Sequence, residues 1–143
     1  MIENNIRFEL TKDIKYFLDL ADENNKGKEP RENVEKLYND YGKEFWKVYI
    51  DDDLKGVIGY FVVNDYYILE GLVDRKKKFG ISNSIKVTNK IIDYMFQFTN
   101  LIRTCARKED KAIQILCKKL GFTEIGEKDG ILIYEKEKIC QQQ

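Results

Sequence analysis

The stretch LVDRKKKFGIS, residues 72–82, joins the end of a predicted strand to the start of a predicted helix. The strand ends at Val73, three lysines fill the turn at residues 76–78, and Gly80 directly precedes the helix, which begins near Ile81. Backbone N–H groups at a helix start lack partners and carry the positive end of the helix dipole, and a glycine lets the main chain approach an oxyanion. The stretch therefore predicts a phosphate-binding cradle. On charge and spacing alone, a solvated loop of lysines is an equally good interpretation of this stretch.

Outward from this stretch, apolar residues recur at strand spacing before it and at helical spacing after it. The wide apolar surface of the helix after Gly80, which includes Tyr94 and Phe98, indicates a helix packed deep against a sheet. Before the long helix, we predict a strand at 6–10, a helix capped by Thr11 that ends at 24–27, a helix from Pro30 to Gly42, and strands at 45–50, 55–63 and 66–73. After it, we predict a strand at 101–106, a helix at 110–120, and a hairpin of 122–126 and 131–138. The helix at 110–120 should direct Ala112, Ile113, Leu116 and Leu120 inward, and Gly121 after it should have a positive φ. The sequence thus predicts one α/β (α+β) domain over residues 1–139, with a mixed central sheet of about seven strands flanked by about four helices. Residues 140–143 are expected to form a frayed tail.

The composition excludes several classes of function. Of the 143 residues, 43% are hydrophobic, which suffices for a buried core, and Lys plus Arg equal Asp plus Glu at 25 each, so no net field draws the chain to nucleic acid or an anionic membrane. The chain has no His, which removes His-based triads and most zinc chemistry. Three cysteines without metal-type spacing fit reduced thiols, and neither a signal peptide nor a membrane-length apolar stretch is present. We therefore expect a cytoplasmic protein without a metal, nucleic-acid or membrane partner.

KKFGIS (residues 77–82) and DKAIQILCKKLGF (residues 110–122) are two motifs at an ordinary separation within this order of elements. The first resembles the Arg/Gln-x-x-Gly-x-Gly/Ala pyrophosphate loop, and the second the Asn-x-Ala-Ala-x-x-Leu-Tyr-x-x-Leu-Gly-Phe helix, of the GCN5-related N-acetyltransferase (GNAT) family. The Gly59-Tyr60 pair also lies where such domains often place it. The resemblance covers nearly the whole chain in element order. It implies the GNAT-like acyl-CoA N-acyltransferase fold, with acetyl-CoA as acyl donor.

In that family the loop amides hold the coenzyme A pyrophosphate and the backbone of the fourth strand pairs with the pantetheine arm. Carried over to this chain, the resemblance implies a set of coenzyme-binding residues: Leu72 and Val73 on the strand, and Lys77, Lys78, Phe79, Gly80, Ile81 and Ser82 in the cradle. Lys77 takes the Arg/Gln position, while Phe79 and Ser82 depart from the pattern. Asp110 replaces an Asn that commonly contacts the coenzyme, so the resemblance also implies Asp110 as a coenzyme-binding residue. We prefer a capping role for it at the start of its helix.

Direct acyl transfer to an amine needs a proton acceptor for the ammonium nucleophile and often a proton donor for the departing thiolate. Glu70 is the candidate base, because related proteins often carry an acidic residue at this place; the alternative is a solvated glutamate facing away from the cleft. Cys117 occupies the position of the family's acidic Tyr, where it is either a weak acid or a small buried hydrophobe. Tyr134 on the last hairpin would supply a phenol if it faces the cleft.

These residues predict an N-acetyltransferase that transfers an acetyl group from acetyl-CoA to a primary amine of a small molecule or protein, as a monomer or homodimer. The alternative is a catalytically degenerate domain that keeps the fold and binds an acyl-CoA as a regulatory or interaction module. Cys117 and Asp110 favour this alternative because both depart from the family pattern. A nucleic-acid-binding domain that uses the three lysines is a weaker alternative, against which the even charge balance argues.

Overall fold

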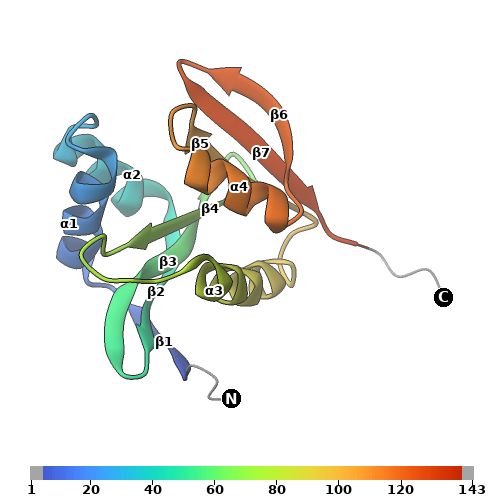
Figure 1. Cartoon of the computed structure of the whole chain (residues 1–143). Helices are drawn as coiled ribbons and strands as arrows, with labels where there is room; N and C mark the ends of the chain where they lie inside the picture. Colours follow the sequence, from blue (N-terminus) through green and yellow to red (C-terminus); the bar gives the residue numbers. More distant parts are fainter. Residues whose placement is uncertain (1–4, 140–143) are drawn as a thin grey trace.

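The structure is a computed structural model that describes residues 5–139, and its seven strands and four helices within that range follow the predicted order (Figure 1). Residues 1–4 and the predicted tail at 140–143, with Cys140, lie outside the described residues. The elements are β1 (Ile6–Thr11), α1 (Ile14–Asn25), α2 (Arg31–Tyr41), β2 (Gly42–Ile50), β3 (Asp53–Val63), β4 (Tyr66–Val73), α3 (Ile81–Met95), β5 (Leu101–Arg107), α4 (Lys111–Lys119), β6 (Thr123–Lys128) and β7 (Ile131–Glu137).

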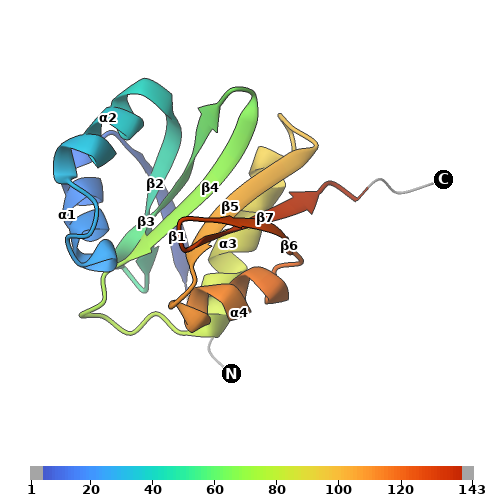
Figure 2. The same ribbon diagram turned by 90° about the horizontal axis from the view of Figure 1, so that it is seen from above.

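The strands form one mixed sheet in the order β1-β2-β3-β4-β5-β7-β6. Every neighbouring pair is antiparallel except β4 and β5, which run parallel because the crossover through α3 joins them. Helices α1 and α2 lie on one face of the sheet, and α3 and α4 lie on the other (Figures 1 and 2). The predicted mixed sheet of about seven strands flanked by about four helices is confirmed.

Two apolar clusters fill the two sides of the sheet. The larger one joins α3 and α4 to the sheet, with Ile92, Met95 and Ile102 almost fully buried. The smaller one joins α1 to β2, β3 and β4, and is rich in edge-to-face aromatic pairs around Phe17 and Phe45. Because side chains alternate across a strand, membership of a cluster shows which face of the sheet a residue occupies.

A close approach between β2 and β3 explains one glycine of the predicted pattern. The register of the two strands shifts between Gly42 and Glu44, and a Cβ at Gly59 would collide with the Glu44 carbonyl and the Phe45 ring. Glycine is therefore the residue that lets β3 pass this irregularity.

Several local predictions need correction. Thr11 is the last residue of β1, and the α1 cap is Asp13, whose carboxylate accepts the Tyr16 N–H at 3.1 Å. Asp13 is the better cap because its side chain reaches the third N–H group of the helix. Phe98 follows the end of α3 and is 53% exposed, so it does not widen the buried face of that helix.

On α4, the predicted inward position of Ala112 is wrong, since this residue is exposed, and Ile113 is only partly covered. The short helix presents a narrower buried face, centred on Cys117. The predicted positive φ of Gly121 is confirmed at 87°. Within residues 5–139, no helix is both long enough and apolar enough to cross a membrane.

Candidate functional site

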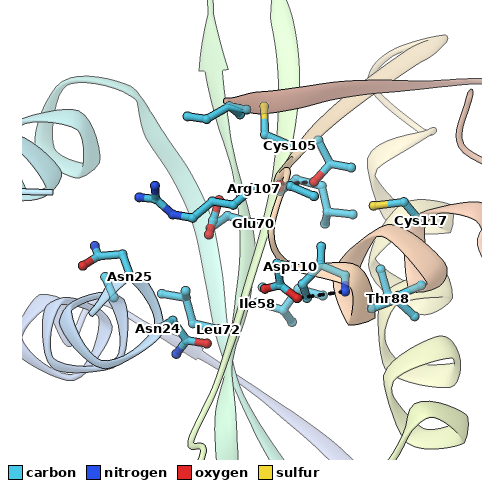
Figure 3. A pocket seen from close by; sticks show the side chains of 18 of the residues that line it. Asn24, Asn25, Ile58, Glu70, Leu72, Thr88, Cys105, Arg107, Asp110 and Cys117 are labelled. Carbon is cyan, nitrogen blue, oxygen red and sulfur yellow. Dashed lines mark hydrogen bonds between the residues drawn. The ribbon is translucent and has the colours of Figure 1, made fainter. Parts of the chain in front are cut away.

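A cavity opens where β4 and β5 part. The two strands pair at only two positions, Tyr67 with Ile102 and Ile68 with Arg103. At the next position the Thr104 hydroxyl donates to the Leu69 carbonyl at 3.0 Å, so a side chain takes the place of the next ladder bond. Beyond it lies a cavity of about 430 Å³, lined by residues from both strands and from α1, α2, α3 and α4 (Figure 3).

The backbone of β4 offers polar groups to this cavity. The Asp74 N–H donates to the Lys55 carbonyl near the start of β3, at 2.8 Å, so the main-chain groups of residues 69, 71 and 73 point the other way, toward β5. Among these residues, the Leu69 carbonyl is used by Thr104, and the Val73 carbonyl accepts a hydrogen bond from Asn24 of α1 at 3.0 Å. Gly71, which lies between them and lines the cavity, keeps its main-chain groups directed into the gap.

The predicted phosphate cradle lies at the start of α3. Gly80 has φ of 82°, and a Cβ built there would meet nothing within 4 Å, so space is open around its main chain. The N–H groups of Ile81 and Ser82, both exposed, have no acceptor within the helix because they belong to its first turn. This 15-residue helix directs the positive end of its dipole to the same place. The geometry fits an anionic group.

The side chains of the cradle serve mainly to hold the loop. Lys77 donates to an Asp53 carboxylate oxygen at 2.7 Å and to the Leu54 carbonyl at 2.8 Å, which ties the loop to the start of β3. Phe79 packs against the larger apolar cluster, which explains a large side chain at this point of the loop. Lys78 is exposed.

Glu70 lines the cavity and is not a solvated glutamate facing away from it (Figure 3). Its carboxylate has no hydrogen bond or ion pair with any residue in the described range. Glu70 is partly exposed, yet burial by the cavity walls raises its pKa to about 7. A carboxyl group of this kind changes between proton acceptor and proton donor near neutral pH.

The two candidate proton donors occupy different places. Cys117 is 4% exposed and lines the cavity from α4, and burial raises the pKa of its thiol to about 11. Tyr134 is 1% exposed in the larger cluster and is absent from the cavity wall, and its hydroxyl has no hydrogen-bond partner within residues 5–139. Burial also raises the Tyr134 pKa. A catalytic role for either residue stays a prediction.

Asp110 caps α4, as expected: its carboxylate accepts the Ile113 N–H at 3.2 Å. It also lines the cavity, so a contact with the coenzyme stays a prediction. Leu72 contributes a buried side chain to the wall.

Sequence reasoning missed Arg107, Cys105 and Gly71, all of which line the cavity. The two-residue alternation of β5 could have found Arg107 and Cys105, since Ile102 and Ala106 face the larger cluster and the odd-numbered residues of the strand face the other way. Because the predicted strand ended at Ala106, Arg107 was assigned to a loop, and the prediction gave no orientation for its side chain.

No protein-family model matches the chain, and no curated protein matches it in sequence. Solved structures match over almost the whole length. An acetyltransferase from Agrobacterium tumefaciens str. C58 superposes with a TM-score of 0.72 at 11% identity, covering 96% of each chain. The Campylobacter jejuni N-acetyltransferase PseH in complex with acetyl coenzyme A gives 0.65 at 19% identity, over 93% of this chain and 99% of PseH. A dodecameric spermidine N-acetyltransferase from Vibrio cholerae gives 0.65 at 17% identity, over 92% and 93%.

At these identities the likeness establishes the fold. The chain has the acyl-CoA N-acyltransferase fold of the GNAT proteins, and the resemblance inferred from residues 77–82 and 110–122 is confirmed at that level.

Proposed function

We propose that this chain is an N-acetyltransferase that transfers an acetyl group from acetyl-CoA to a primary amine, with Glu70 as the base. The observation that carries the proposal is an unpaired carboxyl group, poised near neutral pH, in the cavity where β4 and β5 part. The GNAT fold of the chain supports the donor, because solved structures of this fold include a complex with acetyl coenzyme A.

The cradle at the start of α3, whose residues lie outside the cavity wall, and the cavity itself offer complementary groups to the coenzyme. The open main chain at Gly80 and the N–H groups of Ile81 and Ser82 would hold the pyrophosphate, with Lys77 and Lys78 adding positive charge nearby. Main-chain groups of β4, including Gly71, would pair with the pantetheine arm. The bound coenzyme would supply the thioester that is the acetyl source.

Glu70 would accept a proton from the ammonium group, directly or through a water molecule, because only the free amine attacks a carbonyl carbon. Main-chain N–H groups of β4 would polarise the thioester carbonyl as negative charge develops on its oxygen. A C–N bond forms and the C–S bond breaks, so the sulfur leaves with the bonding electron pair and takes up a proton. Cys117 is the nearer candidate for donating a hydrogen bond to that sulfur, and Tyr134 is the second.

Two measurements test this function. Calorimetry should give saturable binding of acetyl-CoA, and thiol release should follow the addition of an amine from a broad panel. The proposal fails if the purified protein shows no saturable binding of acetyl-CoA.

A second candidate function is a binding module that keeps the coenzyme without turnover. One observation favours it: among residues 5–139 no Tyr side chain lines the cavity, and burial raises the pKa of the thiol that takes the place of the family's Tyr to about 11. A donor with that pKa gives up its proton reluctantly. Binding of acetyl-CoA without thiol release for any amine would support the binding module and exclude the acetyltransferase function.

We also infer a cytoplasmic location, which reduced thiols favour, and a monomer or homodimer in solution. Sedimentation analysis with and without acetyl-CoA tests the oligomeric state. A larger assembly would contradict the prediction.

A further inference from the structure

The cavity is lined by five charged residues, and three of them already have hydrogen-bond partners. Glu29 accepts from the Asn33 side chain at 3.2 Å. The Arg75 guanidinium donates to the side chain and the carbonyl of Asn24, at 3.3 and 3.4 Å. The third is Asp110, which caps α4.

The remaining two are Glu70 and Arg107, which carry opposite charges. Within residues 5–139, neither side chain makes a hydrogen bond or an ion pair, and they do not pair with each other. The pKa of Glu109 is lowered chiefly by its hydrogen bond with Lys28 at 3.0 Å, and Arg107 adds only a smaller effect. Both unpaired groups therefore remain available to a ligand in one cavity.

The fold directs these two side chains to the same face of the sheet. On β4, Leu72 belongs to the cluster under α1, so Glu70, two residues earlier, shares that face. On β5, Ala106 belongs to the opposite cluster, so Arg107 points to the face of α1 and α2. In Figure 3 the Arg107 side chain extends from the end of β5 past Glu70 toward Asn25 of α1.

The rim of the cavity on this face is apolar. Leu37 of α2, Ile113 of α4 and Ile131 of β7 line it and are between 36% and 41% exposed. Apolar surface beside two unpaired charges of opposite sign suits a zwitterion with an apolar part.

We propose that the acceptor of this chain is a primary amine that also carries a carboxylate, with its ammonium group at Glu70 and its carboxylate at Arg107. The inference rests on the acetyltransferase function proposed above. A planar guanidinium binds a carboxylate through two parallel hydrogen bonds, and this geometry makes Arg107 the residue that selects the acceptor. A polycationic amine would place a second ammonium group against this guanidinium and is disfavoured.

The same anion chemistry has a second source, because a coenzyme phosphate also binds a guanidinium. The experiment separates the two sources with Arg107→Gln, the charge-preserving Arg107→Lys, and Lys128→Gln as a control for the loss of one positive charge on exposed β6. Calorimetry gives the dissociation constants of acetyl-CoA and its dephospho form. Thiol release gives kcat/KM for leucine, phenylalanine and β-alanine, each paired with its own carboxamide.

In the wild type, at least one amino acid should be used better than its carboxamide. Arg107→Gln should lower that acid-to-amide ratio by about 10- to 100-fold, as expected for a lost charge-assisted hydrogen-bond pair, while the affinity for both coenzymes stays within about twofold. Arg107→Lys should keep part of the ratio, and Lys128→Gln should not change it. Comparing this ratio between the wild type and a variant cancels the different basicities of the two amines, because the same two substrates are used with both proteins.

A calorimetric arm makes the result independent of turnover: the N-acetylated acids and amides are titrated into the protein with CoA bound. If no amine releases thiol but the N-acetyl acid binds in an Arg107-dependent manner, the carboxylate site is supported and the proposed acetyltransferase activity is excluded. If amines turn over with no preference for any acid, the acetyltransferase stands and this inference is overturned. It is also overturned if Arg107→Gln weakens acetyl-CoA binding tenfold without changing the ratio.

Discussion

The substitution Glu70→Gln should make the protein more stable and much less active. The Glu70 carboxyl group lies in the cavity wall without a hydrogen bond or an ion pair in the described residues, and burial raises its pKa from the usual 4.5 to about 7. A neutral amide of the same shape avoids the cost of holding a desolvated charge but cannot accept a proton.

The sign and size of the effect follow from the two pKa values. The unfolded chain releases this proton near pH 4.5 and the folded chain near pH 7, so the folded state is penalised increasingly as pH rises through this window. The difference between the two values corresponds to about 3 kcal/mol at full ionisation. Because Glu70 is partly exposed to water, we expect the wild type to lose about 2 kcal/mol of unfolding free energy between pH 5 and 7.5.

Urea unfolding at pH 5 and 7.5 measures this change directly. The chain has no His, the side chain whose ordinary pKa lies inside this window, and burial places the pKa of Glu70 there. Glu70→Gln should remove most of the pH dependence and should be about 2 kcal/mol more stable than the wild type at pH 7.5. Glu35→Gln, a matched change at an exposed position of α2, should leave the wild-type profile unchanged.

The kinetic arm uses thiol release over the same pH range. The wild-type kcat/KM should rise with an apparent pKa near 7, and Glu70→Gln should lower it by at least about 100-fold. A wild type whose unfolding free energy is flat within about 0.5 kcal/mol from pH 5 to 7.5 would refute the account of a desolvated carboxyl group.

Three further predictions concern the cradle and the proton donor. Gly80→Val should raise the dissociation constant of acetyl-CoA about tenfold in calorimetry, since a β-branched residue is strained at a φ of 82°, and an unchanged affinity would contradict the role of this main chain. Lys77→Met should weaken acetyl-CoA binding more than Lys76→Met, because only Lys77 ties the loop to Asp53; equal effects would show that the lysines act by charge alone. Cys117→Ala should lower kcat by less than about tenfold, because a thiol with a pKa of about 11 is a poor acid, and a larger loss with intact folding would make the thiol essential.

The order of elements was predictable because each strand and helix carries its own apolar period. Gly121 and Asp110 were also predictable, since a positive φ after a helix and a carboxylate before one are local requirements. The errors arose where two local solutions competed. Thr11 and Asp13 are both good caps, and only the end of β1 decides between them. The exposure of Ala112 depends on how α4 sits on the sheet, which a helical period does not specify.

The site was less predictable because it depends on pairing between distant strands. Residues 77–82 identify the cradle by themselves. By contrast, the Glu70 cavity exists because β4 and β5 separate after two pairs, and strand register is not visible in either strand alone. Arg107 and Tyr134 show the same limit. Arg107 reaches the cavity and Tyr134 is buried away from it in the larger cluster, and the sequence of a single strand specifies neither position.

The short contact between β4 and β5 also divides the sheet into two lobes, and the larger apolar cluster extends across both of them. One lobe holds β1 to β4, and the other holds β5, β7 and β6; along the sheet, two residue pairs and the Thr104 hydroxyl join them. A ligand that hydrogen-bonds to both strands would connect the two lobes at the point where β4 and β5 separate. Deuterium uptake should therefore slow in β5 when acetyl-CoA is added, while β2, which lies within one lobe, changes little.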